Sequence, residues 1–190
     1  MNNILESTYK TVSDWDSLSE EALRYAFTGG REDMGKVVDE PYAIVEAMKK
    51  SLPPKSRVLE VGCGRGRVTK ILSGTYEVVA TDRPRILDLY GRHSPAEIIQ
   101  IGDSVEVDAL LFVYTMQHWP PDVFHKMWNW FKTSVTGWTE AYFVESRSPS
   151  DFPGWNFWNE LHDSNPDLWI VSGWEWEFEP EVIFRHMERQ

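Results

Sequence analysis

Residues 58–69 read VLEVGCGRGRVT, a short apolar run followed by closely spaced glycines and a stretch that can form a helix. A continuous apolar run of this length is typical of a strand buried on both faces of a parallel sheet. Glycine allows the backbone to turn sharply after such a strand and allows a ligand to approach the chain closely. The stretch therefore predicts a strand, a tight turn and a helix around a nucleotide-type ligand.

The spacing of the glycines separates two classes of nucleotide-binding loop. A dinucleotide fingerprint would place its third glycine at position 67, but Arg67 stands there and its side chain would obstruct a pyrophosphate. The three glycines are instead Gly62, Gly64 and Gly66. Glu60 stands two residues before the first of them. This spacing disfavours an oxidoreductase with a nicotinamide cofactor.

Further apolar runs extend the pattern into an α/β fold. They lie at residues 78–81, 98–101, 109–114 and 141–145. The segments between the first two strands and between the last two can hold helices, so we predict a doubly wound, mostly parallel sheet. Aromatic and acidic residues alternate over 174–179, which predicts one more strand, with residues 181–189 as its antiparallel hairpin partner.

Two helices are predicted ahead of the first strand. Ser17 and Glu20 have the spacing of a capping box, which would start a helix that ends near Gly29. Asp39 is suited to cap a second helix with Pro41 in its first turn.

Size and charge restrict the class of protein. The 190 residues fit one domain over 1–190, with a helical prelude at 1–54 and the sheet-containing core at 55–190. The net charge of −11 disfavours a broad nucleic-acid surface. Cys63 is the single cysteine, which excludes an internal disulfide and a cysteine metal cluster. No apolar run is long enough to span a membrane and no signal peptide is recognised, so we expect a cytoplasmic protein.

The order acid-x-Gly-x-Gly-x-Gly over residues 60–66 resembles the first motif of the class I S-adenosylmethionine-dependent methyltransferases. The resemblance covers residues 55–145 and is strongest in its first two motifs. It implies a Rossmann-like fold, S-adenosylmethionine as cofactor, and cofactor contacts from Glu60, Gly62, Cys63, Gly64 and Gly66. As alternatives, the glycines can mark a tight turn alone, and Glu60 can pair with Arg57 or Lys70.

Two later acidic residues fit the same family. Asp82 ends the second predicted strand, 20 residues after Gly62, and an acidic side chain there can accept two ribose hydroxyls. The resemblance implies this role for Asp82, a place beside the adenine for Arg83, and a contact between Asp103 and the adenine amino group. The alternative for Asp82 is to cap the helix that begins at Pro84.

Candidate acceptor residues follow the fourth and fifth predicted strands. A sulfonium methyl is already activated, so the protein mainly aligns the acceptor and excludes water. For an acceptor that loses a proton, His118 or Glu145 can serve as base, and Tyr114 can orient the acceptor. A histidine in a turn is also often simply solvated. Three tryptophans are predicted to line the pocket: Trp119, Trp155 and Trp158.

The predicted function is methyl transfer to a nitrogen or oxygen of a small-molecule acceptor, with no metal required. Two alternatives stay open, a non-catalytic regulator or partner subunit that binds the same cofactor, and a methyltransferase that acts on a protein or nucleic acid. An aminopropyl-transferring relative is disfavoured, because such enzymes add an acidic site after the fourth strand and residues 114–119 contain no Asp or Glu.

The link between the third and fourth predicted strands lacks the helix that the family normally places there. Residues 102–108 must pass over two strands, a span of roughly 14 Å, and extended they reach about 23 Å. Without the helix, one face of the sheet near the first and fourth strands needs another cover. We expect the prelude, or a second copy of the chain in a homodimer, to pack there.

Overall fold

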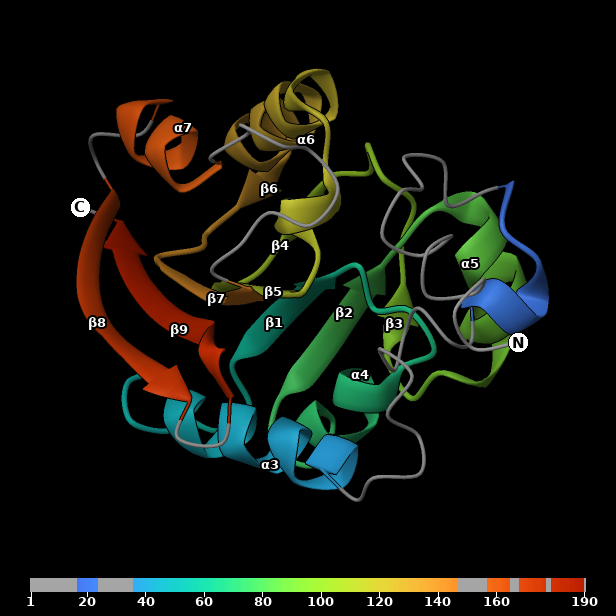
Figure 1. Ribbon diagram of the computed structural model, residues 1–190, viewed down its shortest axis with the longest axis horizontal. Helices are drawn as coiled ribbons and strands as arrows, with labels where there is room; N and C mark the ends of the chain where they lie inside the picture. The colour runs from blue at the N-terminus through green and yellow to red at the C-terminus, as the bar shows by residue number, and fades with distance from the viewer. Residues whose placement is uncertain (1–16, 24–35, 147–156, 165–167, 177–178, 190) are drawn as a thin grey trace.

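The fold is described by a computed structural model over residues 17–23, 36–146, 157–164, 168–176 and 179–189. The strands are β1 (Arg57–Val61), β2 (Glu77–Thr81), β3 (Glu97–Ile98), β4 (Val105–Glu106), β5 (Ala109–Val113), β6 (Val135–Thr136), β7 (Glu140–Ser146), β8 (Leu168–Trp176) and β9 (Glu179–Arg189). The main sheet has seven strands in the order β3-β2-β1-β5-β7-β9-β8 (Figure 1). The first five run parallel, and β9 is antiparallel to both of its neighbours. The predicted α/β sheet with a C-terminal antiparallel hairpin is therefore confirmed, but residues 174–179, predicted as one strand, include the end of β8 and the start of β9.

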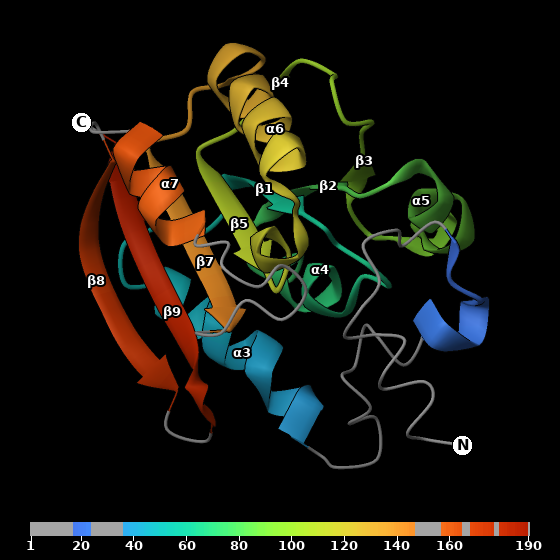
Figure 2. The same cartoon turned by 45° about the horizontal axis from the view of Figure 1, so that its top comes forward.

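Helices lie on both faces of this sheet. They are α3 (Lys36–Met48), α4 (Arg67–Leu72), α5 (Pro84–Tyr90), α6 (Pro121–Thr133) and α7 (Phe157–Ser164). Helices α3 and α4 cover one face, and α6 and α7 lie on the other (Figures 1 and 2). Single turns of 3-10 helix, η2 (Gly91–His93) and η3 (Met116–His118), follow α5 and β5. Among the described residues, no helix combines the length and the apolar character needed to cross a membrane.

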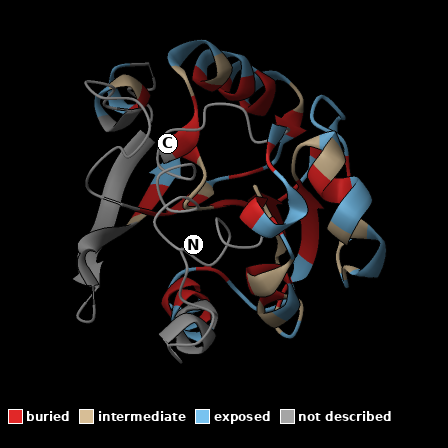
Figure 3. Cartoon of the chain, turned by 45° about the vertical axis from the view of Figure 1, so that its right-hand side comes forward, coloured by how far each residue is buried: buried red, intermediate tan, exposed pale blue. Residues whose placement is uncertain are grey.

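Two hydrophobic cores flank the sheet, because successive residues of a strand point to opposite faces. In β1, Val58 belongs to the core formed with α3 and α4, whereas Leu59 belongs to the core beneath α6. The core beneath α6 is rich in large aromatic side chains, and the Phe112 and Phe143 rings stack there at 5.0 Å. Figure 3 shows the buried residues following the strands and parts of the helices that cover them.

The connection from β3 to β5 contains no helix, as predicted. It crosses β2 and β1 and includes β4, which pairs with β6 in a separate two-stranded sheet. Ile99, Val105 and Val107 of this connection join the core beneath α6. Trp130 of α6 donates its Nε1 hydrogen to the Asp103 carbonyl at 2.9 Å, which fixes the connection to the helix. The connection and α6 therefore cover the face that the family's missing helix would cover.

The described residues of the prelude pack elsewhere, so the expectation that they cover this face is wrong. Leu18, Ala22 and Leu23 cluster with Ile86 of α5, and α3 lies on the opposite face of the sheet. The physical reason is the size of the aromatic side chains beneath α6, which together with the β3–β5 connection fill the space beside the strands.

Both predicted helix starts are shifted in the structure. Ser19, rather than Ser17, caps the first helix: the Ala22 amide donates to Ser19 Oγ at 3.1 Å, and the helix begins at Glu20. Both serines can cap in principle, and the one directly before the first helical residue does so. The predicted end near Gly29 lies outside the described residues.

The second helix begins one turn earlier than predicted. It starts at Lys36, so Asp39 and Pro41 lie within α3 rather than at its beginning. A proline inside a helix removes one backbone hydrogen bond. We attribute the longer helix to tertiary packing, because Ile44 and Met48 on its apolar face are fully buried against the sheet.

Candidate active site

The loops after β1 and β2 meet at the carboxyl end of the sheet. The amides of Gly62 and Cys63 donate to the Thr81 carbonyl at 2.9 and 3.2 Å. The Gly64 amide donates to Asp82 Oδ2 at 2.8 Å. The glycine turn is thereby tied to the end of β2, at the edge where open α/β sheets bind ligands.

Gly62 lies where the turn after β1 packs against the turn after β5. Its φ is 77°, and those of Gly64 and Gly66 are 55° and 76°, all in the left-handed region. A Cβ on Gly62 would lie 2.3 Å from Thr115 Oγ1. The Thr115 hydroxyl in turn donates to the Val61 carbonyl at 3.0 Å. Direct packing of the two turns therefore requires glycine at position 62.

Glu60 is buried beneath the glycine turn, with 2% of its surface exposed. Its Oε2 accepts a hydrogen bond from Thr69 Oγ1 of α4 at 2.6 Å. Arg57, one of the alternative partners considered above, pairs instead with Glu97 at 2.6 Å. Burial raises the pKa of Glu60 to about 8, and the bond from Thr69 opposes this shift. The carboxyl is therefore mostly neutral at pH 7.

Stability should fall with rising pH because of Glu60. Its folded pKa of about 8 lies above the ordinary value of 4.5, so its contribution is fully present below pH 4.5 and is lost as pH rises to about 8. The neutral variant Glu60→Gln should therefore gain stability relative to the wild type by a few kcal/mol between pH 5 and pH 9. Urea unfolding of both proteins over this range measures the difference.

The matched control is Glu97→Gln, which changes an exposed carboxylate, 56% accessible, in the same sheet. Its stability difference from the wild type should stay constant between pH 6 and pH 9. A constant difference for Glu60→Gln over the same range would mean that Glu60 is ionised in the folded protein.

Asp82 is half-buried at the end of β2, and its two oxygens accept backbone amides. Oδ2 accepts the Gly64 amide at 2.8 Å and Oδ1 accepts the Arg83 amide at 2.7 Å. Helix α5 has Arg83 as its N-cap residue and no side-chain cap, so Asp82 does not cap it. Asp82 therefore links the glycine turn to the residue that precedes α5.

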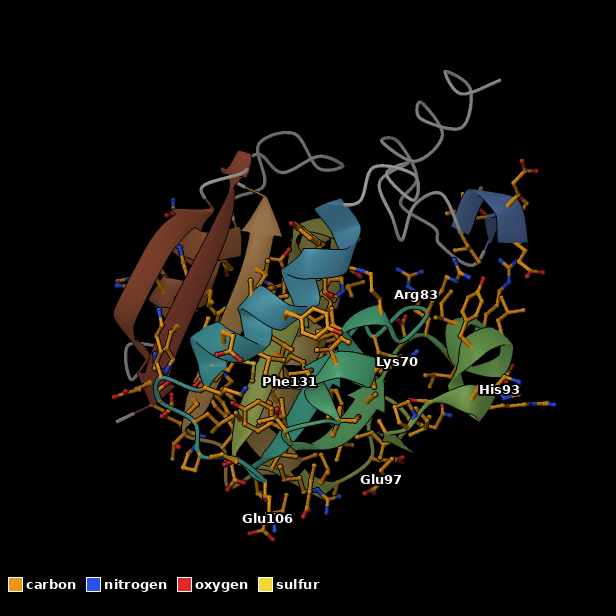
Figure 4. The ribbon with its side chains drawn as sticks, turned by 90° about the horizontal axis from the view of Figure 1, so that it is seen from below. Lys70, Arg83, His93, Glu97, Glu106 and Phe131 are labelled. Atoms are coloured by element: carbon orange, nitrogen blue, oxygen red, sulfur yellow. The ribbon has the colours of Figure 1, made fainter. Side chains whose placement is uncertain are left out.

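Three other predicted cofactor residues have different surroundings. Figure 4 shows Arg83 at the end of the molecule toward which β7 points, with Glu97 and Glu106 at the opposite end. Asp103 lies in an exposed loop, where its Oδ2 accepts the Gln100 amide at 2.8 Å and closes the turn after β3. Burial raises the pKa of the Cys63 thiol well above its ordinary value, so the side chain is a protonated thiol in the turn.

Glu145 anchors the turn after β5. It is fully buried near the end of β7, and its Oε1 accepts the amides of Thr115 at 3.0 Å and Met116 at 2.9 Å. These amides lie at the start of η3, whose last residue is His118. The carboxylate therefore holds the backbone that carries His118, and this contact favours a positioning role for Glu145.

His118 and Tyr114 lie on the same turn. The His118 side chain is buried, with 6% exposed, and its amide donates to the Thr115 carbonyl at 3.2 Å. Tyr114 follows β5 directly and has φ 51°, an uncommon left-handed conformation for a residue other than glycine. Its amide donates to the Val144 carbonyl at 2.7 Å, which holds the strained residue against β7.

Of the three tryptophans predicted to line the pocket, the structure describes the side chain of one. Trp119 is buried and packs edge-on to Phe112 at 6.3 Å in the core beneath α6. Trp155 lies outside the described residues, and so does the side chain of Trp158.

Two threonines that the sequence analysis did not single out hold the site together. Thr69 binds Glu60, and Thr115 joins the glycine turn to the turn after β5. The local signals for them are weak: Thr69 lies in the first turn of the helix after the glycines, and Thr115 follows the fourth predicted strand.

Several proteins of known structure share this architecture. No protein-family model matches the chain, and no curated protein matches it by sequence. A TehB-like SAM-dependent methyltransferase from Corynebacterium glutamicum aligns with a TM-score of 0.64 and 17% identity, covering 90% of this chain and 96% of that one. The chain has the class I S-adenosylmethionine-dependent methyltransferase fold. A SAM dependent methyltransferase from Aquifex aeolicus aligns with a TM-score of 0.65 and 12% identity, covering 92% of this chain and 100% of that one.

A third methyltransferase-fold structure is a complex with a ligand. The DhpI–SAH complex aligns with a TM-score of 0.61 and 17% identity, over 100% of this chain and 98% of that one. The methyltransferase fold thus agrees with the resemblance that the motif at residues 60–66 indicates.

Proposed function

We propose that the chain is an S-adenosylmethionine-dependent methyltransferase that acts on a nitrogen or oxygen of a small-molecule acceptor. The observation that carries this proposal is the hydrogen bond from the Gly64 amide to Asp82 Oδ2 at 2.8 Å. It brings a glycine turn and an acidic side chain together at the carboxyl edge of the sheet. This pair suits a nucleoside ligand, because the turn admits close approach and the carboxylate accepts ribose hydroxyls.

The residues around this pair suit the cofactor as well. Gly62 and Cys63 are held by the Thr81 carbonyl, so the turn is preformed. Glu60, mostly neutral at pH 7, can donate as well as accept a hydrogen bond beneath the turn. S-adenosylmethionine supplies an activated methyl group when bound, and the chain's own residues then align the acceptor and exclude water.

The turn after β5 is the proposed acceptor side. His118 is the candidate base, because it lies on the turn that packs against Gly62 through Thr115. Its low exposure limits access of water to the imidazole. Tyr114 is proposed to orient the acceptor, and Glu145 to position His118 through the Thr115 and Met116 amides. The net charge of −11 supports a small molecule over a nucleic acid as acceptor.

Asp82→Ala should weaken binding of S-adenosylmethionine and S-adenosylhomocysteine by about 5- to 150-fold. The ribose hydroxyls would lose their acceptor, at a cost on the order of 1 to 3 kcal/mol. Titration calorimetry with each ligand measures the effect. Asp88→Ala, which removes an exposed acid on α5, is the matched control and should bind as the wild type does.

Two results would contradict the proposal at different levels. Equal affinity in Asp82→Ala and the wild type would remove Asp82 from the ribose site. Absence of binding to the wild-type chain would overturn the cofactor assignment itself. Once binding is established, formation of S-adenosylhomocysteine in a screen of amines, phenols and carboxylic acids separates an enzyme from a non-catalytic cofactor-binding regulator.

A further inference from the structure

A second group of polar side chains lies at the amino end of β7. Strands β7 and β9 are antiparallel, with Glu140 opposite Glu188 and Tyr142 opposite His186. Residues two apart on a strand point to the same face, and directly opposed residues share a face as well. Tyr142 belongs to the core formed with α3, so all four side chains are on that face of the sheet.

Three of these side chains bring possible metal-ligand atoms close together. Glu140, His186 and Glu188 each offer one ligand atom, and the three atoms lie within 4.8 Å of one another. His186 Nε2 contacts Glu140 Oε2 directly. The His186 side chain is 6% exposed and that of Glu140 16% exposed, whereas Glu188 is exposed. The group is therefore anchored on its inner side and open to solvent on its outer side.

The inner two ligands are held in place by a second layer of contacts. The Tyr142 hydroxyl donates to Glu140 Oε2 at 3.4 Å, and Ser51 Oγ lies 2.8 Å from that hydroxyl. The Tyr142 and His186 rings stack at 4.7 Å with an angle of 6° between them. Such outer contacts orient the ligands of metal sites in proteins.

Charge also favours a cation at this position. Two carboxylates directly opposite each other on neighbouring strands repel, and the chain as a whole carries −11. An imidazole with two carboxylates suits divalent transition ions such as Zn²⁺ and Mn²⁺, whereas Mg²⁺ and Ca²⁺ prefer oxygen ligands alone. We propose that Glu140, His186 and Glu188 bind one divalent transition-metal ion.

This site is independent of the proposed methyl transfer. Glu140 and Glu145 lie five residues apart on β7, which corresponds to roughly 17 Å at about 3.3 Å per residue. The ion would link β9 to β7 across the pair Glu140 and Glu188. Because the ion binds the folded chain, it would stabilise the attachment of the C-terminal hairpin to the sheet.

The proposal is tested by titrating the full chain, freed of metal with a chelator, with Zn²⁺. We expect one Zn²⁺ per chain and a higher melting temperature in its presence. Glu188→Gln and His186→Asn should each weaken binding by about tenfold or more. Glu188 is exposed, so its variant should fold normally and isolates the loss of a ligand.

The matched control uses another histidine that lies beside a carboxylate. His125 Nε2 of α6 is 3.3 Å from Glu160 Oε1 of α7, and the pair is largely exposed. His125→Asn should bind Zn²⁺ as the wild type does. A Co²⁺-loaded chain should show no thiolate-to-metal absorption, which separates the site from Cys63. Absence of stoichiometric Zn²⁺ binding, or equal affinity in Glu188→Gln, His186→Asn and His125→Asn, would overturn the proposal.

Discussion

Replacing Gly62 by alanine should lower the free energy of unfolding by about 2 to 5 kcal/mol and remove measurable cofactor binding. An alanine at φ 77° costs roughly 1 to 2 kcal/mol, because its Cβ is crowded in the left-handed region. The Cβ would also lie 2.3 Å from Thr115 Oγ1, and overpacking of this kind costs about 1 to 3 kcal/mol. Urea unfolding and titration with S-adenosylhomocysteine measure the two effects.

Gly66→Ala separates the two causes. Gly66 has nearly the same φ, 76°, but the atom nearest to its added Cβ is 3.7 Å away, so this variant should lose only the conformational part. The double variant Gly62→Ala, Thr115→Ala lacks the Thr115 Oγ1. The Cβ of residue 115 then lies 3.1 Å from the Cβ added at position 62. In a double-mutant cycle this pair should recover part of the loss. Equal losses for Gly62→Ala and Gly66→Ala would show that the two turns do not constrain each other.

Glu145→Ala should lower the free energy of unfolding by about 2 to 6 kcal/mol, because it leaves two amides without an acceptor at roughly 1 to 3 kcal/mol each. These are the amides of Thr115 and Met116, which Glu145 Oε1 now accepts at 3.0 and 2.9 Å. Glu145→Gln keeps an oxygen that can accept both amides and replaces only the other oxygen by an NH2 group, so its loss should be less than half as large. Urea unfolding of the three proteins gives the comparison.

Hydrogen exchange distinguishes this local role from a general loss of stability. In Glu145→Gln the amides of Thr115 and Met116 should exchange faster, while those of Val58 and Val78 in the core change little. Glu46→Ala, which removes an exposed carboxylate on α3, should leave all four amides unchanged. Unaltered exchange at Thr115 and Met116 in both Glu145 variants would show that the carboxylate does not hold the turn.

The sequence predicted the parts of the fold that depend on short-range patterns. Apolar runs of four to six residues marked β1, β2, β5 and β7, because a strand buried on both faces needs apolar side chains throughout. The short link at residues 102–108 correctly predicted a crossing without a helix. Helix starts were less well predicted, since Ser17 and Ser19 are equivalent as local capping signals.

The sequence predicted where the glycine turn and Asp82 lie along the strands, but not the contacts that hold them together. The glycine spacing placed the turn after β1, and the position of Asp82 followed from the end of the second strand. Two contacts of the site depend on tertiary packing. They are the hydrogen bond between Thr69 and Glu60 and the contact between Gly62 and Thr115. No local pattern distinguishes these threonines from others in the chain.

What the sequence by itself determined is the local geometry: a strand, a glycine turn that needs left-handed backbone, and the helices around them. The tertiary structure decided which distant residues meet. The order β5-β7-β9-β8 puts Glu140 opposite Glu188, and the parallel pairing of β5 with β7 brings Glu145 to the turn of His118. The physical reason is that strand pairing is chosen by burial of the whole sheet, so contacts across it are fixed only when all strands are in place.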